Sequence, residues 1–257
     1  MKFGRSNNPM FSEKAMAKAK AEVLDGDLYG NNNEGGGAII EETMTVSGAV
    51  NKTIMLTLVM LVVALYSYST PMSIFLPVGA LGAAAVFLFT SFKPQYSPIT
   101  APLFALLEGL FVGAISAYYA FQFEGIILQA VTATVGVLLT MLMVHKSGLI
   151  PVTQKFRMGV SMAVGAIMLL YLVSWIGHFV GFEIPYLHEG GAIGIGITVV
   201  IIGVAALNLL LDFDNFEKGE QAGAPKFMEW YFGMGLLFTL VWLYVEFLRL
   251  ISKLQRD

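Results

Sequence analysis

The chain contains no cysteine and few charged residues, and both absences exclude classes of protein. Without thiols it has no disulfides, no cysteine nucleophile and no cysteine-ligated metal site. Charged residues make up 13% and hydrophobic residues 56% of its 257 residues, whereas soluble domains contain about 25% charged residues. The mean hydropathy is +0.72. This composition predicts an integral membrane protein.

Basic residues and histidines are too sparse or too scattered for several functions. The net charge is −3, and no basic patch with interleaved aromatic residues occurs, so we expect no nucleic-acid partner. His145 falls at one end of the predicted bundle and His178 and His188 at the other, which argues against a histidine-bound catalytic metal. Asp212 and Asp214 share one helix end, whereas an intramembrane aspartyl protease needs aspartates on two helices. We therefore predict that the protein is not an enzyme and has no cofactor.

The N-terminal residues lack an apolar segment. Residues 1–46 are polar and end in a glycine- and asparagine-rich run, so they bury too little apolar surface to offset the entropy of ordering. We predict a disordered tail, without a cleaved signal peptide, that precedes a membrane domain over residues 47–257. Within the tail, residues 12–24 can form a short amphipathic helix, either transient or bound to a membrane surface or partner.

The remaining sequence offers seven apolar segments near the length of about 20 residues that a helix needs to cross a bilayer. Their short connections contain helix-breaking residues such as Pro71, Pro94 and Gly125. These features predict an all-α bundle of seven transmembrane helices. The predicted spans are residues 50–68, 74–92, 99–121, 126–145, 158–180, 192–211 and 230–251.

Lysine and arginine are absent from every second loop of this bundle, and the asymmetry predicts its orientation. The basic residues of the short loops all fall on one side: Lys93, Lys146, Lys155, Arg157, Lys218 and Lys226. Cytoplasmic loops are enriched in lysine and arginine. We therefore expect the N terminus and these loops in the cytoplasm.

The C-terminal residues depart from this rule. An odd number of spans places Arg249, Lys253 and Arg256 on the outer side. The last span either crosses with a tolerated basic tail or re-enters the membrane, and we favour crossing because residues 230–251 are long enough. Glu246 lies one helical turn before Arg249, so we predict an ion pair between them at the membrane edge.

Carboxylates gather between the sixth and seventh spans. Asp212 and Asp214 close the predicted sixth span, Glu217 and Glu220 follow in the loop, and Glu229 opens the seventh. Two carboxylates in a partly dry site cannot cheaply both ionise, so a pair can share a proton; when deprotonated it offers oxygen ligands to calcium. The alternative is ordinary helix-end charges in water. We predict a pH-sensing ion path through Asp212, Asp214 and Glu229, with the two aspartates as calcium contacts.

Glu108 lies within the third span, about nine residues from either edge and therefore near the bilayer midplane. An ionised carboxylate is costly at that depth, so Glu108 must be protonated, paired or in contact with water. Its helical neighbours Phe104 and Phe111 offer no partner, so any partner comes from another helix. The alternative is a neutral glutamic acid hydrogen-bonded inside the bundle. We predict Glu108 as part of the ion path or pH sensor.

The third span also has a stripe of small residues at four-residue spacing. The stripe consists of Ala105, Gly109, Gly113 and Ala117. Small residues let transmembrane helices approach closely. We therefore expect this face to pack against another helix.

Several stretches of the membrane part resemble one known family. They are MTVSGAVNKT, APLFALLEGLFVGAIS, LHEGGAIGIG, ALNLLLDFDNFEKGEQAGAPKFMEWY and LVWLYVEFLRL, with NPMF near the N terminus. From Met44 onward the chain resembles the Bax inhibitor/YccA-like family, most closely its bacterial branch. The resemblance implies a seven-helix bundle with the last helix central. It also implies a location in the lipid bilayer of the bacterial inner membrane.

The resemblance further implies a function. Members of the family are associated with a pH-sensitive calcium leak, gated by one aspartate at the inner end of the sixth helix and one in the seventh. Asp212, in LLLD, matches the first position. Counting back from Arg249, the second position falls near Phe238 or Thr239, and neither is acidic.

This departure leaves the second carboxylate open. Glu108, Asp214 or Glu229 can substitute for it, and Glu108 is the best candidate because it alone lies deep in the membrane. On this hypothesis the protonated acids hydrogen-bond across helices, and deprotonation drives them apart and creates a cation path around the last helix. The alternative is a regulator that does not transport ions. Some bacterial relatives are linked to modulation of a membrane quality-control protease, and the N-terminal tail would suit that role.

Overall fold

The computed structural model describes residues 42–70, 72–181 and 191–256 of the chain, without the side chains of residues 178–180. The tail up to residue 41, with its predicted amphipathic helix, lies outside the described residues. The described part contains seven helices long and apolar enough to cross a membrane. They are α2 (Val46–Ser69), α3 (Phe75–Phe92), α4 (Ser97–Gln122), α5 (Ile126–Ser147), α6 (Gln154–Val180), α7 (Gly191–Gln221) and α8 (Met228–Leu254), with a 3-10 turn, η2 (Pro94–Tyr96), before α4.

The seven predicted spans are confirmed, but the sixth ends later than predicted. The sequence places its end at Leu211, whereas α7 continues to Gln221. The acidic stretch after Leu211 contains no proline, and the chain turns only at Gly223, whose φ is +62°. Asp212 therefore lies within α7, about 14 Å along the helix from its end. The predictions that Asp212 and Asp214 close the span and that Glu217 and Glu220 lie in a loop are wrong.

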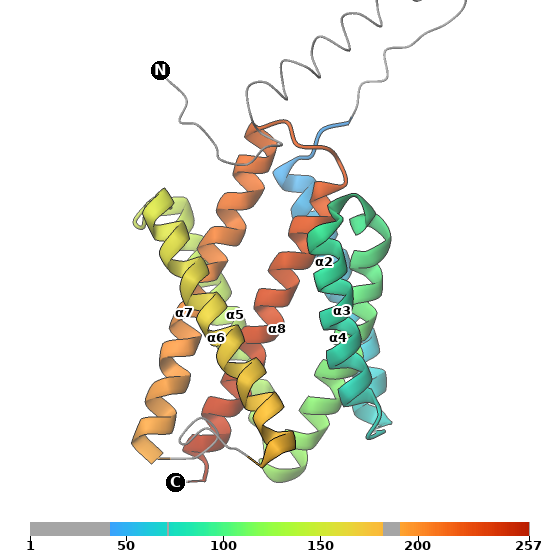
Figure 1. Ribbon diagram of the computed structural model, residues 1–257, viewed down its shortest axis with the longest axis vertical. Coiled ribbons are helices and arrows are strands. Elements are labelled where there is room, and N and C mark those ends of the chain that lie inside the picture. The colour runs from blue at the N-terminus through green and yellow to red at the C-terminus, as the bar shows by residue number, and fades with distance from the viewer. Residues whose placement is uncertain (1–41, 71, 182–190, 257) are drawn as a thin grey trace, which may run out of the picture. The chain divides into compact units, whose positions relative to one another are not determined.

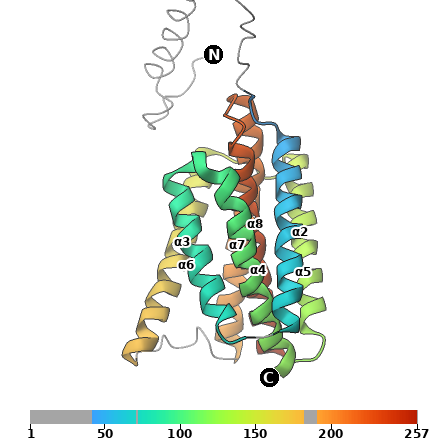
Figure 2. The ribbon, with the colours of Figure 1, turned by 90° about the vertical axis from the view of Figure 1, so that its right-hand side faces the viewer.

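The last helix, α8, is the core of the bundle, as the resemblance implied. It is the most buried of the seven helices and packs along α2, α4, α5 and α7. Figure 1 and Figure 2 show it running between the other helices. From α3, Phe87 stacks on Phe238 with ring centroids 4.7 Å apart, and from α6 the Tyr171 hydroxyl donates to Glu246 at 2.6 Å. All six other helices therefore contact α8.

The chain before α2 packs against the turn between α7 and α8. The amide of Met44 donates to the carbonyl of Ala224 at 2.8 Å, and the amide of Lys226 donates to Glu42 at 3.0 Å. The Met44 side chain is buried. Residues 42–46 thus pack on the bundle, whereas the sequence placed the start of the membrane domain at residue 47.

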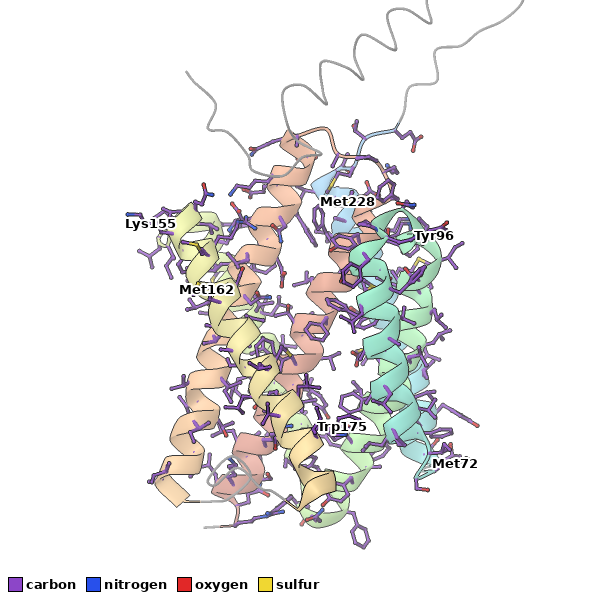
Figure 3. All side chains as sticks on the ribbon, viewed as in Figure 1. Met72, Tyr96, Lys155, Met162, Trp175 and Met228 are labelled. Atoms are coloured by element: carbon purple, nitrogen blue, oxygen red, sulfur yellow. The ribbon has the colours of Figure 1, made fainter. Side chains whose placement is uncertain are left out.

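The two ends of the bundle differ in the segments that they contain. The connection end contains residues 42–46 and the α7–α8 turn, and the C-terminal end contains the last turn of α8. Figure 3 shows Met228 and Tyr96 near the connection end and Met72 near the other. α2, α4, α6 and α8 begin at the connection end, and the helices between them run back toward it.

The small-residue stripe of α4 packs against α2, as predicted. A Cβ atom at Gly109 would lie 2.6 Å from the carbonyl oxygen of Met60. A Cβ atom at Gly113 would overlap the carbonyl oxygen of Ala64 and approach the Cβ of Ser67 to 2.6 Å. The two backbones are in direct contact here because neither glycine has a side chain.

We expect Gly113→Ala to destabilise the protein by about 1–3 kcal/mol, because overpacking forces the two backbones apart. The measurement is the midpoint of thermal unfolding in detergent. Gly136→Ala in α5 is the matched control, since a Cβ there meets nothing within 4 Å. Equal midpoints for the two variants would contradict the close α2–α4 contact.

Candidate functional site

Asp212 faces α8 from inside α7. The Thr239 hydroxyl donates a hydrogen bond to Asp212 Oδ2 at 2.7 Å. Asn208, one turn earlier on α7, donates to Thr239 Oγ1 at 3.0 Å and lies 3.4 Å from the same carboxylate oxygen. Within the described residues no lysine, arginine or histidine forms an ion pair with Asp212. The carboxylate is therefore held by neutral donors from two helices.

Thr239 is also one of the two positions, with Phe238, near which the resemblance implied a second aspartate. The structure brings it into contact with Asp212, while its neighbour Phe238 stacks on Phe87 of α3. The structure thus joins the sixth and seventh spans through a carboxylate of α7 and a hydroxyl of α8. Sequence reasoning located Thr239 and set it aside because it is not acidic.

A cavity of about 170 Å³ lies beside this contact. It is lined by Phe87, Asp212, Asn215, Tyr231, Phe232, Met234 and Gly235. Because α8 begins at the connection end, the stretch from Tyr231 to Gly235 places the cavity between that end and Thr239. A buried water needs only about 15 Å³ of such space, so the cavity has room for a hydrated ion.

Asp214 contacts a different part of the bundle from Asp212. Arg157 of α6 and Lys218 of α7 both form ion pairs with it, the latter at 2.7 Å. Residues two positions apart on a helix do not share a face. The structure therefore does not bring Asp212 and Asp214 together as a proton-sharing pair. Of the two predicted calcium contacts, only Asp212 is without an ion pair in the described part of the chain, where no group of three histidine or acidic side chains could hold a metal.

Glu229 fastens the start of α2 to the start of α8. Its Oε1 accepts from the Thr45 amide at 3.0 Å and the Thr45 hydroxyl at 3.3 Å, and lies 3.3 Å from Lys226 Nζ. The side chain is buried. Ten residues separate Glu229 from Thr239, which is about 15 Å along α8. Glu229 is thus apart from the Asp212 contact, and its partners give it a structural role at the connection end.

Glu108 is buried at the middle of α4. Its side chain is 6% exposed, and its Oε2 has no hydrogen-bond partner among the described residues. Two contacts give the register of α4 against α8: the Ser97 hydroxyl donates to the Phe227 carbonyl at 2.7 Å, and Ser116 and Tyr244 are hydrogen-bonded at 2.7 Å. Glu108 therefore lies level with the turn of α8 just before Thr239.

Glu108 and Asp212 nevertheless lie against different faces of α8. The apolar cluster that contains the α4 face flanking Glu108 includes Leu237 and Val241. The cluster around α7 includes Leu236 and Leu243 instead. The two acids thus lie at similar depth on either side of the central helix, and within the described part Thr239, not Glu108, is the partner of Asp212 from outside α7.

A second buried carboxylate on α8, Glu246, was predicted from the sequence only as a member of an ion pair at the membrane edge. The predicted pair of Glu246 with Arg249 is confirmed at 3.3 Å, but Glu246 is only 1% exposed. Its Oε1 also accepts from the Tyr171 hydroxyl at 2.6 Å and the Trp242 indole at 3.2 Å, and its Oε2 has no partner within the described residues. The Arg249 guanidinium lies 4.8 Å from the centre of the Tyr171 ring. Trp242 lies four residues before Glu246 and Arg249 three residues after it, so the three share one helix face. This spacing was the signal in the sequence that could have identified the cluster.

The basic residues near the end of α8 are likewise held inside the bundle. Lys253 is buried and donates to the Gly194 carbonyl at 3.0 Å and the Thr198 hydroxyl at 3.1 Å. Arg249 is paired with Glu246. These two basic residues therefore lie within a packed helix, whereas the rule that places lysine and arginine in the cytoplasm concerns charges in loops.

The fold and the site together define an integral, multi-pass membrane protein in which a carboxylate inside α7 makes a polar contact with the central helix. A family model described as Bax inhibitor 1 like matches residues 8–256. The chain therefore belongs to the Bax inhibitor 1 like family, which confirms the resemblance seen in the sequence. No curated protein and no solved structure matches the chain significantly.

Proposed function

We propose that the protein is a calcium leak whose flux depends on pH through Asp212. The observation that carries the proposal is the position of this carboxylate: it lies within a membrane-spanning helix, has neutral partners, and lines a cavity of about 170 Å³. The family is associated with calcium leak activity. We place the protein in the bacterial inner membrane with its connection end in the cytoplasm.

The protonation state of Asp212 changes the contact between α7 and α8. When Asp212 is neutral, it and Thr239 hydrogen-bond across the two helices, and no charge has to be solvated. When Asp212 is ionised, its charge is shielded from bulk water, and the nearby charge of Arg157 compensates it only in part. The ionised form is therefore costly unless water or a cation in the cavity joins it. Carboxylate, hydroxyl and amide oxygens are the ligands that calcium prefers, and Asp212, Thr239 and Asn208 can supply them. Flux is therefore low at acidic pH and rises as pH rises.

Two further acids extend this path. Glu108 lies at similar depth on the other side of α8, so ionisation of both Glu108 and Asp212 puts a negative charge on each side of the central helix. Glu246 lies seven residues beyond Thr239 on the same face, about 10 Å toward the C-terminal end.

The proposal is tested by calcium flux into liposomes across a range of pH. Wild-type flux is expected to rise with pH, and Asp212→Asn to lower it about tenfold at pH 7.5, because loss of one charge-assisted contact corresponds to about 1.4 kcal/mol or more. Asp212→Asn should also flatten the pH profile. Glu217→Gln is the matched control, since this acid is on the same helix but exposed, with His145 as its partner. It should leave the profile unchanged.

Flux no greater than that of empty liposomes would overturn the leak. The function would then be the alternative, a membrane regulator that binds a quality-control protease through the N-terminal tail, and removal of residues 1–41 should abolish that regulation. A pH-dependent flux that persists in Asp212→Asn but not in Glu108→Gln would assign the sensor to Glu108.

A further inference from the structure

The surface of the bundle is hollowed between α2 and α5, down to the central helix. The groove has a volume of about 480 Å³. Residues Leu61, Leu65, Val131 and Val135, all well exposed, form its rim on α2 and α5. Buried residues of α4 and α8 form its floor: Val112, Ser116, Leu237, Val241 and Tyr244. A molecule in this groove lies against α8.

The groove has almost no polar group available to a ligand. Ser116 and Tyr244 are hydrogen-bonded to each other at 2.7 Å. The hydroxyls of Thr57 and Thr134 donate to carbonyls of their own helices, each at 2.8 Å. Since these polar groups are satisfied internally, the surface that remains for an occupant is apolar.

The rim opens onto the face that contacts the bilayer. In a chain that spans the membrane, the exposed leucines and valines of α2 and α5 lie in hydrocarbon, so the groove is continuous with the lipid-facing surface. From Thr57 to Tyr68 it extends about 16 Å along α2, close to half of a hydrocarbon core of about 30 Å. The groove therefore has the length of one leaflet.

The position of the groove indicates which leaflet. α2 begins at the connection end, so its second half, from Thr57 to Tyr68, lies toward the C-terminal end of α8. Tyr68 is next to the last residue of α2, at the level where tyrosines meet the membrane interface. The apolar groove thus ends at Tyr68, whose hydroxyl lies near the lipid headgroups.

We propose that this groove binds one acyl chain of a phospholipid from the leaflet at the C-terminal end of α8, with Tyr68 near the headgroup. Its volume is within the range of about 300–1,000 Å³ that is usual for small-molecule sites with mainly apolar walls. Leu237 and Leu240, which line it, flank Thr239 in sequence. The bound chain therefore contacts the turn of α8 that holds Asp212. The binding site itself depends on membrane insertion and not on the leak.

The test uses a phospholipid with a diazirine on its acyl chain, reconstituted with the full chain in liposomes, irradiated and mapped by mass spectrometry of peptides. Labelling of α8 at residues 237–241 is the expected result, because lipid in the bulk bilayer reaches only the outward faces of the helices. Labelling confined to outward residues such as Leu128 would overturn the proposal. Labelling of α8 by a diazirine fatty acid but not by the phospholipid would also overturn it.

A pair of tryptophan variants on α5 provides the matched control. Val131→Trp fills the rim of the groove, whereas Leu128→Trp adds the same side chain at a residue that is 73% exposed and does not line it. We expect α8 labelling to fall to background in Val131→Trp and to persist in Leu128→Trp, with unchanged circular dichroism. Val135→Trp repeats the test from the next turn if Val131→Trp does not fold. Equal α8 labelling in folded rim variants and in Leu128→Trp would overturn the site.

Discussion

Thr239→Asp is expected to convert the contact with Asp212 into a pair of carboxylates and to make the proposed calcium flux more steeply dependent on pH. The Thr239 hydroxyl lies 2.7 Å from Asp212 Oδ2, so an aspartate at position 239 places two acids within hydrogen-bonding distance. Two like charges about 4 Å apart repel by about 4 kcal/mol at an effective dielectric constant of 20. The pair therefore shares one proton. The contact between α7 and α8 stays intact until a higher pH removes that proton.

Two results are expected in the liposome assay. The midpoint of the flux profile should move to higher pH by about one unit or more, because the second ionisation of the pair is opposed by the first. Above that midpoint, flux should exceed that of the wild type, since mutual repulsion separates α7 from α8. Below it, the shared proton links the two helices and flux should be low.

Thr239→Asn is the control that separates the effect of the new charge in Thr239→Asp from the effect of the new side chain's size. Asparagine has nearly the shape of aspartate but no charge, so its profile should keep the wild-type midpoint. Thr239→Ser keeps the hydroxyl donor and should behave as the wild type. Identical profiles for Thr239→Asp and Thr239→Asn would refute the role of position 239 as the partner of Asp212 in the pH response.

Glu246→Leu is expected to destabilise the bundle by about 3 kcal/mol, because breaking a buried ion pair leaves the other charge uncompensated. Arg249 loses its ion-pair partner, and the Tyr171 hydroxyl and the Trp242 indole lose the acceptor that they share. The effect should be seen as a lower midpoint of thermal unfolding in detergent. It should be larger than that of Gly113→Ala.

The double variant Glu246→Leu/Arg249→Leu tests whether the cost comes from the pair. Removal of both charges leaves no uncompensated charge, and such replacements are often nearly neutral. We therefore expect the double variant to be more stable than Glu246→Leu alone. If the destabilisation of the double variant equals the sum of those of Glu246→Leu and Arg249→Leu within about 0.5 kcal/mol, the two residues are not energetically coupled and the prediction is wrong.

The sequence by itself determined the class of the protein and its seven helices. Every backbone polar group in a bilayer must be paired, so a segment that crosses it forms either a helix or part of a closed barrel. Apolar segments of about 20 residues have the length of a helix that crosses the bilayer. The close α2–α4 contact was also readable, because Gly109 and Gly113 recur at four-residue spacing. Both are local signals that need no knowledge of the partner helix.

The end of α7 could not be predicted from polarity. Acidic residues marked an apparent boundary at Leu211. A helix nevertheless continues until the backbone leaves the helical conformation, which here happens at Gly223. Asp214 is tolerated inside it because Arg157 and Lys218 compensate its charge. Arg157 lies on α6, 57 residues earlier in the chain.

Which acids meet was decided only by the tertiary structure. Periodicity gives the depth of Glu108 and the pairing of Glu246 with Arg249, but it does not give the face of α8 that each neighbouring helix covers. The rotation and register of α4 and α7 against α8 direct Glu108 to one face and Asp212 to another, opposite Thr239. Those angles result from apolar packing over the whole length of the helices, and no local spacing in the sequence encodes them.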